Sequence, residues 1–251
     1  MKDLMMVVSS ILFGIVFSFL VIIFAVFIAS RFVKRKEFRF LPKISVIIPA
    51  YNEGKNIESC IKSIFMSTYP ANKKEIIVVD DGSKDNTEDI LRKYKNVNVL
   101  RQNHLGKVEA LNHGAKNTSR DFVVTIDADT ILDKNCITEL VAPFAEKSIG
   151  ATTGNNNVRN NSSILGMFQN VEYHLSNLIR NSFSITFYSG AWISGSLACY
   201  RKEALKQVGY FKKDTLAEDI DVALELRKKG YTTIALPKAL GFTIVPTSLR
   251  G

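Results

Sequence analysis

Carboxylates that follow two short apolar runs are the residues best placed for chemistry in this sequence. Asp80 and Asp81 follow the run EIIVV, and Asp127 and Asp129 follow FVVTI with one alanine between them. Such pairs beside a turn can reach one hard cation, and Mg²⁺ or Mn²⁺ completes its shell with water and phosphate oxygens. A capping or turn role would explain either pair alone. Two acidic pairs at one sheet edge favour a site for a cation and a phosphate.

Two further elements could bind a nucleotide. Pro49 ends the run ISVIIP, and Tyr51 then presents an aromatic face on which a nucleobase could stack, although the ring could equally cover the end of a sheet. Gly106 and Lys107 open a helix whose amides and ammonium group could meet a diphosphate. The sequence contains neither the spacing G-x-x-x-x-G-K-[ST] nor G-x-G-x-x-G, which argues against ATPases and NAD-dependent enzymes.

Short β-branched runs alternate with helical stretches in the segment that carries these residues. The runs are apolar with polar ends, as expected of buried parallel strands, and the stretches between them carry apolar residues at helical spacing. The predicted strands are 44–49, 75–80, 97–101 and 121–127, and the predicted helices are 56–66, 85–94 and 107–116. This alternation predicts a doubly wound α/β sheet, whose ligands bind beyond the carboxyl ends of the strands.

The rest of the chain continues the same domain. Further helices are expected at 135–146, 163–180 and 218–229, strands at 149–155 and 192–200, and a polar loop at 155–161. No internal repeat or composition boundary divides residues 44–251, so we expect one domain there.

An uncharged run of 27 residues separates Asp3 from Arg31 and exceeds the roughly 20 apolar residues that cross a hydrocarbon core. A signal peptide normally has a shorter apolar run with positive charge before it, whereas here the charge follows. Residues 31–43 carry a net charge of +5, which the positive-inside rule places in the cytoplasm. We therefore expect a transmembrane helix at 1–30, a basic juxtamembrane linker at 31–43, and a cytoplasmic domain at 44–251 of a single-pass cell-membrane protein.

The positive charge of the chain requires no nucleic acid. More than half of the formal net charge of +9 lies in the juxtamembrane linker, where it favours anionic headgroups. The three cysteines are Cys60, Cys136 and Cys199, and their wide spacing suggests neither a disulfide framework nor a zinc site. The three histidines, His104, His113 and His174, are scattered, and we interpret them as structural or surface groups.

In this order, the residues resemble the family 2 glycosyltransferases, which have the GT-A fold. The resemblance rests on SVIIPAYNE (45–53), IVVDDGS (77–83), Gly106-Lys107 with Ala110-Leu111-Asn112, and Asp127-Ala128-Asp129. It extends from about residue 44 to residue 240. The segments QNVEY (169–173), SGS (194–196) and AED (217–219) are similar to the membrane-embedded branch of hyaluronan, chitin-oligosaccharide, poly-N-acetylglucosamine and cellulose synthases. The resemblance implies a Rossmann-like mixed sheet flanked by helices, preceded here by one transmembrane helix.

The resemblance also implies a role for each motif. The donor would be a nucleotide-diphosphate sugar, typically a UDP-sugar, with Tyr51 and Asp81 at the nucleobase, Glu53 near the ribose, and Lys107 and Asp127 at the ribose or diphosphate. With Pro49, these residues form the expected donor site. Asp129 would ligate Mg²⁺ or Mn²⁺, and Asp219 would be the general base of an inverting transfer. Gly195, Ser196 and Glu218 would contribute to the site of a saccharide or lipid-linked acceptor. A plain N-cap is the alternative for Asp219.

The sequence departs from the processive relatives after Asp219. Their Gln-x-x-Arg-Trp motif and further membrane helices do not follow, and the single tryptophan, Trp192, lies earlier. We expect either a truncated synthase that a membrane partner subunit could complete, an enzyme that adds one or a few sugars, or a donor-binding module without turnover. A nucleotidyltransferase ranks behind these, because the sequence has no glycine- and arginine-rich triphosphate loop.

Overall fold

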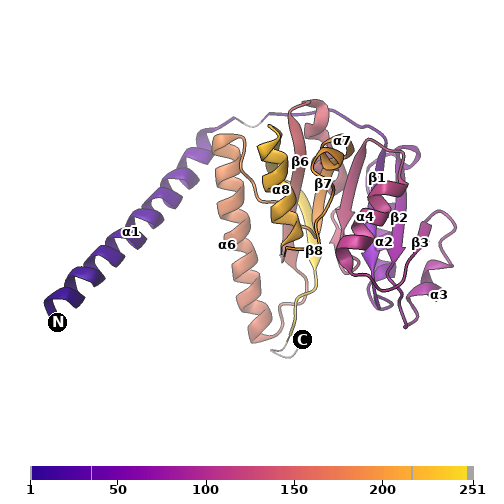
Figure 1. Ribbon diagram of the computed structural model, residues 1–251, viewed down its shortest axis with the longest axis horizontal. Coiled ribbons are helices and arrows are strands. Elements are labelled where there is room, and N and C mark those ends of the chain that lie inside the picture. The colour runs from indigo at the N-terminus through magenta and orange to yellow at the C-terminus, as the bar shows by residue number, and fades with distance from the viewer. Residues whose placement is uncertain (1, 35, 216, 248–251) are drawn as a thin grey trace.

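A computed structural model describes residues 2–34, 36–215 and 217–247. The long helix α1 (Lys2–Phe32) projects away from an α/β domain, and α6 (Ile164–Phe187) lies between α1 and the sheet (Figure 1). Among the described helices, α1 alone is long and apolar enough to cross a membrane by length and composition. Only 6% of its apolar segment is buried in the protein, so most of this surface is available to lipid.

One eight-stranded sheet forms the centre of the domain, in the order β3-β2-β1-β4-β7-β6-β8-β5. The strands are β1 (Ile44–Ala50), β2 (Lys74–Asp80), β3 (Asn98–Arg101), β4 (Phe122–Ile126), β5 (Ile131–Leu132), β6 (Ile149–Val158), β7 (Leu197–Arg201) and β8 (Thr232–Thr243). The first four strands in this order are parallel, β7 is antiparallel to β4 and β6, and β8 is parallel to β6. The expected mixed sheet is confirmed.

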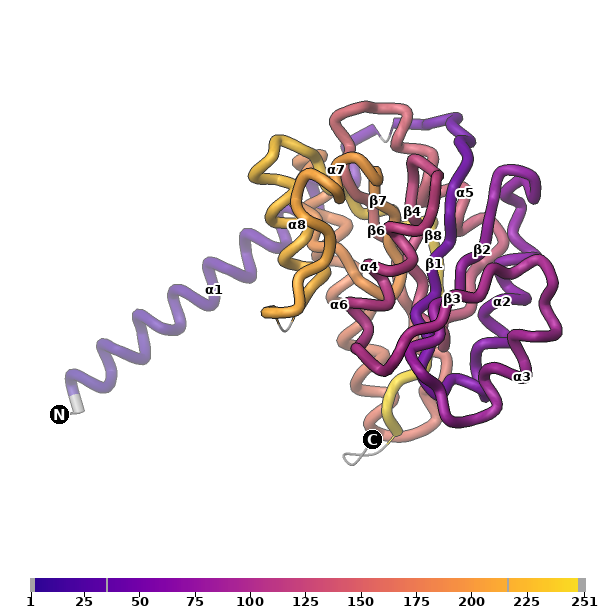
Figure 2. The backbone as a smooth tube through the Cα atoms, turned by 45° about the vertical axis from the view of Figure 1, so that its right-hand side comes forward, coloured from indigo at the N-terminus to yellow at the C-terminus, as the bar shows by residue number. Residues whose placement is uncertain are grey.

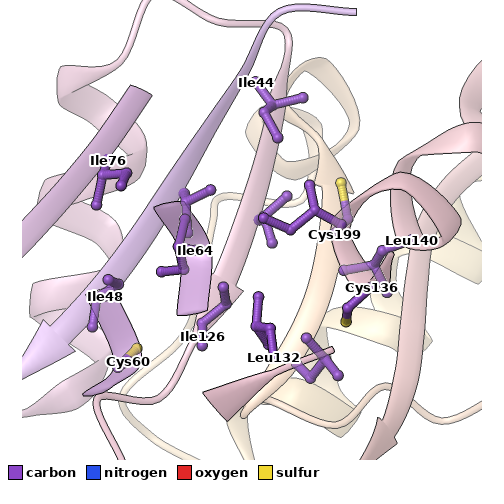
Figure 3. Close-up of a cluster of buried hydrophobic side chains, with 14 of the residues drawn as sticks. Ile44, Ile48, Cys60, Ile64, Ile76, Ile126, Leu132, Cys136, Leu140 and Cys199 are labelled. Carbon is purple, nitrogen blue, oxygen red and sulfur yellow. The ribbon is translucent and has the colours of Figure 1, made fainter. Parts of the chain in front are cut away.

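Alternation along the central strands gives the sheet two hydrophobic faces. Val46 and Ile48 of β1 point into one core, and Ile47 between them points into the other. Figure 3 shows part of the first core, where Cys60, Cys136 and Cys199 pack among isoleucine and leucine side chains. All three thiols are free and fully buried, and burial raises their pKa.

Helices cover both faces. On the first face are α2 (Ile57–Phe65), α3 (Thr87–Leu91) and α5 (Cys136–Val141), and on the second are α4 (Lys107–Asn117), α7 (Lys202–Gln207) and α8 (Glu218–Lys228). Short 3₁₀ helices span Ala71–Lys73 and Ala142–Ala145. The tube view in Figure 2 shows α4 in front of β1 and α8 near β6 and β7. The amino-terminal ends of α4 and α8 therefore lie on the same face of the sheet.

Several elements differ from the sequence-based expectations. The strand expected at 192–200 begins only at Leu197, and the helix expected at 163–180 continues to Phe187. The long strand β8 was not predicted, because Pro237 and Gly241 weaken the strand signal. Its pairing with β6 shifts register between Thr153 and Asn155, next to the segment that contains Pro237. The irregularity accommodates the proline within an otherwise paired strand.

The prediction of a polar loop at 155–161 is wrong for the first four residues, which belong to β6. The asparagines there form hydrogen bonds with side chains and with backbone carbonyls of β8 instead of entering an apolar core. Asn156 is buried, and its side chain donates to the hydroxyls of Ser194 (2.8 Å) and Ser196 (2.6 Å). The side chain of Asn177 in α6 donates to the backbone carbonyl of Asn156 (2.8 Å). The segment is polar because its side chains form a buried hydrogen-bond network with α6 and with Ser194 and Ser196.

Close packing of α4 on β1 leads to a first prediction. A Cβ atom at Gly114 would lie 2.6 Å from Cγ2 of the buried Ile47, so Gly114→Ala must displace helix or strand. We expect the free energy of unfolding to fall by about 1–3 kcal/mol, as for other overpacked cores. Urea unfolding of the detergent-solubilised chain measures this change. Lys116→Ala, on the exposed side of α4, is the matched control, and equal midpoints for both variants would contradict the prediction.

Candidate active site

A cleft of about 330 Å³ opens at the carboxyl ends of β1, β2 and β4. All of the predicted donor residues and the predicted metal ligand line it, together with residues that the sequence did not single out as ligands. The lining consists of Pro49, Ala50, Tyr51, Glu53, Asp81, His104, Gly106, Lys107, Ala110, Asp127, Ala128 and Asp129. Parallel strands bring residues from distant motifs to one edge, as expected for this architecture.

The aromatic face of Tyr51 is partly covered by His104. The two rings stack with centroids 4.0 Å apart and an interplanar angle of 23°. The sequence interpretation placed His104 among structural or surface groups, but the structure places it in the cleft. A base that stacks on the same face of Tyr51 must displace the imidazole, whose side chain is 58% exposed and has room to move.

Asp81 organises the segment that leads into α4. One carboxylate oxygen accepts hydrogen bonds from Gln102 Nε2 (2.7 Å) and the Leu105 amide (2.8 Å). The other accepts from the Gly106 amide (2.9 Å) and lies 2.9 Å from His104 Nδ1. Burial favours the neutral acid, but these hydrogen bonds outweigh it and lower the pKa of Asp81. Asp81 therefore stays ionised at neutral pH and fixes the turn at Gly106, whose φ of +95° suits glycine.

Lys107 lines the first cleft, and its charge also interacts with the carboxylates at the start of α8. Its Nζ lies 2.6 Å from Asp127 Oδ1. Burial alone would lower the pKa of Lys107, but Asp127 opposes this effect, with smaller contributions from Glu218 and Asp219, and the pKa is raised. The ammonium group is thus a fixed positive charge at the amino-terminal turn of α4, where an anion is also favoured by free backbone amides.

Asp129 and Glu53 fit a divalent cation. Burial, and then the charge of Asp127, raise the pKa of Asp129, while the hydroxyls of Thr130 and Thr243 donate to its Oδ1. Burial also raises the pKa of Glu53, with a contribution from Asp129. Among the described residues Lys107 pairs with Asp127, whereas neither Asp129 nor Glu53 has an ion-pair partner. The described residues contain no cluster of three ligating side chains, so a cation there would need water and diphosphate oxygens.

A second cleft, of about 190 Å³, lies beside Asp219. The Gly195 amide donates to Asp219 Oδ2 (2.7 Å) and the Ile220 amide donates to Oδ1 (2.8 Å). The lining consists of Asn156, Glu172, Tyr173, Ser176, Asn177, Arg180, Trp192, Ile193, Ser194, Asp219 and Ile220. Two amides thus hold the carboxylate in place and leave lone pairs on both oxygens for a hydroxyl in the cleft.

The predicted acceptor residues lie around this second cleft without lining it. Gly195 acts through its amide, and its lack of a side chain matters because a Cβ would lie 3.2 Å from Asp219 Oδ2. Ser196 bonds to Asn156, and Glu218 precedes Asp219 at the first turn of α8. The cleft is lined largely by α6, whose contribution the sequence indicated only through the QNVEY segment.

Arg180 ties α6 to the sheet behind the second cleft. Its buried guanidinium donates to the Gly154 carbonyl (2.7 Å) and to the side chains of Asn177 (2.7 Å) and Asn155 (3.2 Å). Burial lowers the pKa of Arg180 to about 10, which leaves it a cation at neutral pH. The polar face of α6 is therefore fixed against β6.

Comparison with known proteins identifies the domain as a family 2 glycosyltransferase domain with the GT-A fold. The family model "Glycosyl transferase family 2" matches residues 45–209. The chain belongs to this family, and the predicted family, fold class and enzyme class are confirmed.

Curated relatives are polysaccharide synthases. The chain is 38% identical over 219 residues to a poly-β-1,6-N-acetyl-D-glucosamine synthase of Staphylococcus aureus, a match that covers 84% of this chain and 52% of the relative. The corresponding synthase of Staphylococcus epidermidis is 35% identical over 225 residues, covering 86% and 53%. The chain thus spans about half the length of these relatives.

Solved structures share the fold. A mannosyltransferase from Pyrobaculum calidifontis in complex with GDP-mannose and Mn²⁺ superposes with a TM-score of 0.72 at 23% identity, covering 94% of this chain and 69% of that chain. Staphylococcus aureus TarS (residues 1–349) in complex with UDP-GlcNAc gives 0.61 at 22% identity, covering 82% and 59%.

Proposed function

We propose that the chain is a membrane-anchored, inverting glycosyltransferase that transfers a sugar from a UDP-sugar to a saccharide or lipid-linked acceptor with the aid of Mg²⁺ or Mn²⁺. The observation that carries the proposal is the pair of clefts and the position of Lys107. The charge of Lys107 interacts with Asp127 of the first cleft and with Asp219 of the second. The first cleft has the chemistry of a nucleotide-diphosphate site, and the second presents Asp219 to an incoming hydroxyl.

The residues of the first cleft fit the parts of a UDP-sugar. Tyr51 offers a ring face to the base, and Asp81 with the Gln102–Gly106 segment forms the wall beside it. Glu53 would contact the ribose and Lys107 the diphosphate, since both line this cleft. Relatives named as N-acetylglucosamine polymer synthases, and a structural neighbour that binds UDP-GlcNAc, support a UDP-sugar as the donor.

Asp129 would hold the divalent cation, which supplies charge stabilisation to the diphosphate leaving group when bound. Asp127 would contribute through its ion pair with Lys107, since both side chains face the same cleft. The structural neighbour in complex with Mn²⁺ supports the choice of Mg²⁺ or Mn²⁺.

Asp219 would remove the proton from the acceptor hydroxyl. The freed oxygen bonds to the anomeric carbon while the bond from that carbon to the diphosphate breaks, and the proton remains on the Asp219 carboxyl group. Attack opposite the leaving group inverts the anomeric configuration and requires no second carboxylate as a nucleophile. The Gly195 and Ile220 amides hold Asp219 in orientation during this step.

The anchor would place this chemistry at the cytoplasmic face of the cell membrane. Helix α1 supplies a single apolar span, and the basic residues that follow it favour the cytoplasmic side. The proposed domain limits remain 1–30 for the span, 31–43 for the linker and 44–251 for the catalytic domain. We include a membrane partner subunit among the proposed partners.

Loss of the aromatic face at Tyr51 is expected to weaken UDP binding. Stacking of a base on an aromatic ring contributes roughly 1–3 kcal/mol, so Tyr51→Ala should raise the Kd for UDP by about 5- to 150-fold. Isothermal titration calorimetry with Mn²⁺ measures the change. Tyr51→Phe keeps the ring and serves as the control. Equal affinities for the alanine and phenylalanine variants would exclude stacking at this position.

The experiment that tests the function follows UDP release by the full chain in detergent, with Mn²⁺, a panel of UDP-sugars and an oligosaccharide acceptor. We expect one UDP-sugar to give UDP together with a product of inverted anomeric configuration, which NMR identifies. Metal-dependent UDP binding without turnover would instead support the donor-binding module. If the chain neither bound UDP nor turned over any UDP-sugar, the proposal would be overturned.

A further inference from the structure

Helix α6 carries a row of exposed apolar side chains on the face opposite to the second cleft. We define the α6 stripe as Ile164, Phe168, Val171, Leu175 and Leu178. Their exposed fractions range from 43% to 76%. At about 100° per residue, these positions fall within an arc of about 80° on the helix. A patch of this kind on a water-soluble surface marks an interaction site.

The polar side of α6 is already occupied by the protein. Arg180 and Asn177 bond to β6, and Glu172 and Tyr173 line the second cleft. Glu172 and Arg180 are the only charged residues among the 24 of the helix, and neither lies on the α6 stripe. The stripe is therefore an uncharged surface on a helix that the sheet holds in a fixed orientation.

Helix α1 covers the continuation of the same face. Ser182 and Thr186 lie on the line of the α6 stripe, one and two helical turns beyond Leu178. Ser182 is buried, and Thr186 Oγ1 donates to the Val26 carbonyl of α1 (3.3 Å). Small residues four positions apart are typical of helix pairs that pack closely in membranes.

The exposed apolar surfaces of α1 and α6 belong to adjoining helices. Figure 1 shows α1 and α6 meeting at one end and lying on the same side of the sheet. From Leu4 to Phe24 most exposed side chains of α1 are large and apolar, as are those of the α6 stripe; the small exceptions are Ser9, Ser10, Gly14 and Ser18. Residues 4–30 of α1 and the α6 stripe carry no charged side chain, so lipid that surrounds α1 would meet no charge at the stripe.

We propose that the α6 stripe lies against the acyl-chain region of the bilayer, as a second membrane contact beside α1. The proposal rests on the membrane anchoring proposed above. It places the second cleft, on the opposite side of the same helix, at the membrane surface. An acceptor or product held there would lie about one helix diameter, roughly 10 Å, from the lipid.

Spin labels on the full chain in phosphatidylcholine–phosphatidylglycerol nanodiscs test this arrangement. Cysteine is introduced singly as Val171→Cys or Leu175→Cys in the stripe, Phe17→Cys in α1, and Lys93→Cys beside α3 at the far end of the sheet. The three native thiols are buried, so the nitroxide reagent attaches at the introduced position. Power saturation then compares collisions with oxygen, which partitions into lipid, and with a water-soluble nickel chelate.

We expect oxygen collisions to exceed nickel collisions at residues 171, 175 and 17, and the ratio to invert at residue 93. Dominant nickel collisions at 171 and 175, with oxygen dominant at 17, would overturn the α6 contact while leaving the anchor intact. Dominant nickel collisions at 17 would overturn the anchor itself. Immobilised labels at 171 and 175 that neither reagent reaches would show that a second copy or another protein segment covers the stripe, which also overturns the proposal.

Discussion

Replacement of Asp219 by asparagine is expected to lower the turnover of UDP-sugar by roughly 10²- to 10⁴-fold, the usual contribution of a general base. Asparagine can still accept the hydrogen bond from the Gly195 amide, so the local backbone should remain in place. It cannot take a proton from the acceptor hydroxyl at neutral pH. We therefore expect the loss in kcat, with the affinity for UDP nearly unchanged.

Asp221→Asn is the matched control for this variant. Asp221 lies on the same first turn of α8, but its carboxylate faces Lys212 at 3.5 Å and lies outside both clefts. Turnover of this variant should equal that of the unmodified chain. UDP release is measured for all three proteins, and calorimetry confirms that each binds UDP. Equal turnover in the two variants would show that Asp219 has only a structural role in the first turn of α8.

Removal of the cation site is expected to have a comparable effect. Asp129→Asn removes a partly buried carboxylate that lines the first cleft and has no ion-pair partner among the described residues. A bound cation contributes several kcal/mol to stabilisation of the leaving group, and about 1.4 kcal/mol corresponds to a factor of ten in rate. A loss of about 4 kcal/mol of stabilisation corresponds to a decrease in turnover on the order of a thousandfold, which is the effect we expect. The Mn²⁺ concentration at half-maximal activity should rise as well.

Chelation and a distant variant complete this test. EDTA should abolish UDP release from the unmodified chain, and added Mn²⁺ should restore it. Asp121→Asn removes an exposed carboxylate at the opposite end of β4 and should leave the metal titration unchanged. An unaltered metal titration for Asp129→Asn would assign the cation to other ligands.

The parallel half of the sheet was predictable because β1, β2 and β4 are buried on both faces. Buried parallel strands read as continuous apolar runs, and their carboxyl ends must meet at one edge. The donor residues could therefore be placed together from their positions after these runs. Strand β8 was not predictable in the same way, since Pro237 lies within it and its pairing depends on a register shift with β6.

The second cleft depended on contacts that no local pattern reveals. Tyr173 and Asn177 of α6 meet Trp192 and Asp219 only after the chain has folded over the sheet. His104 was missed for a similar reason, because its contact with Tyr51 joins two loops that are 53 positions apart in the chain. A sequence shows which side chains can react, but the partners that hold them come from long-range packing.

Asp81 has a consequence for protein engineering. Its carboxylate joins the wall beside Tyr51 to the backbone turn that starts α4. In the proposed donor site, recognition of the base and of the phosphates would therefore share one short segment, Gln102–Gly106. Substitutions chosen to change the preferred nucleobase will also shift the turn that carries Lys107. Donor specificity in this enzyme should therefore change through coupled replacements within that segment, with strong epistasis between positions that never touch the sugar.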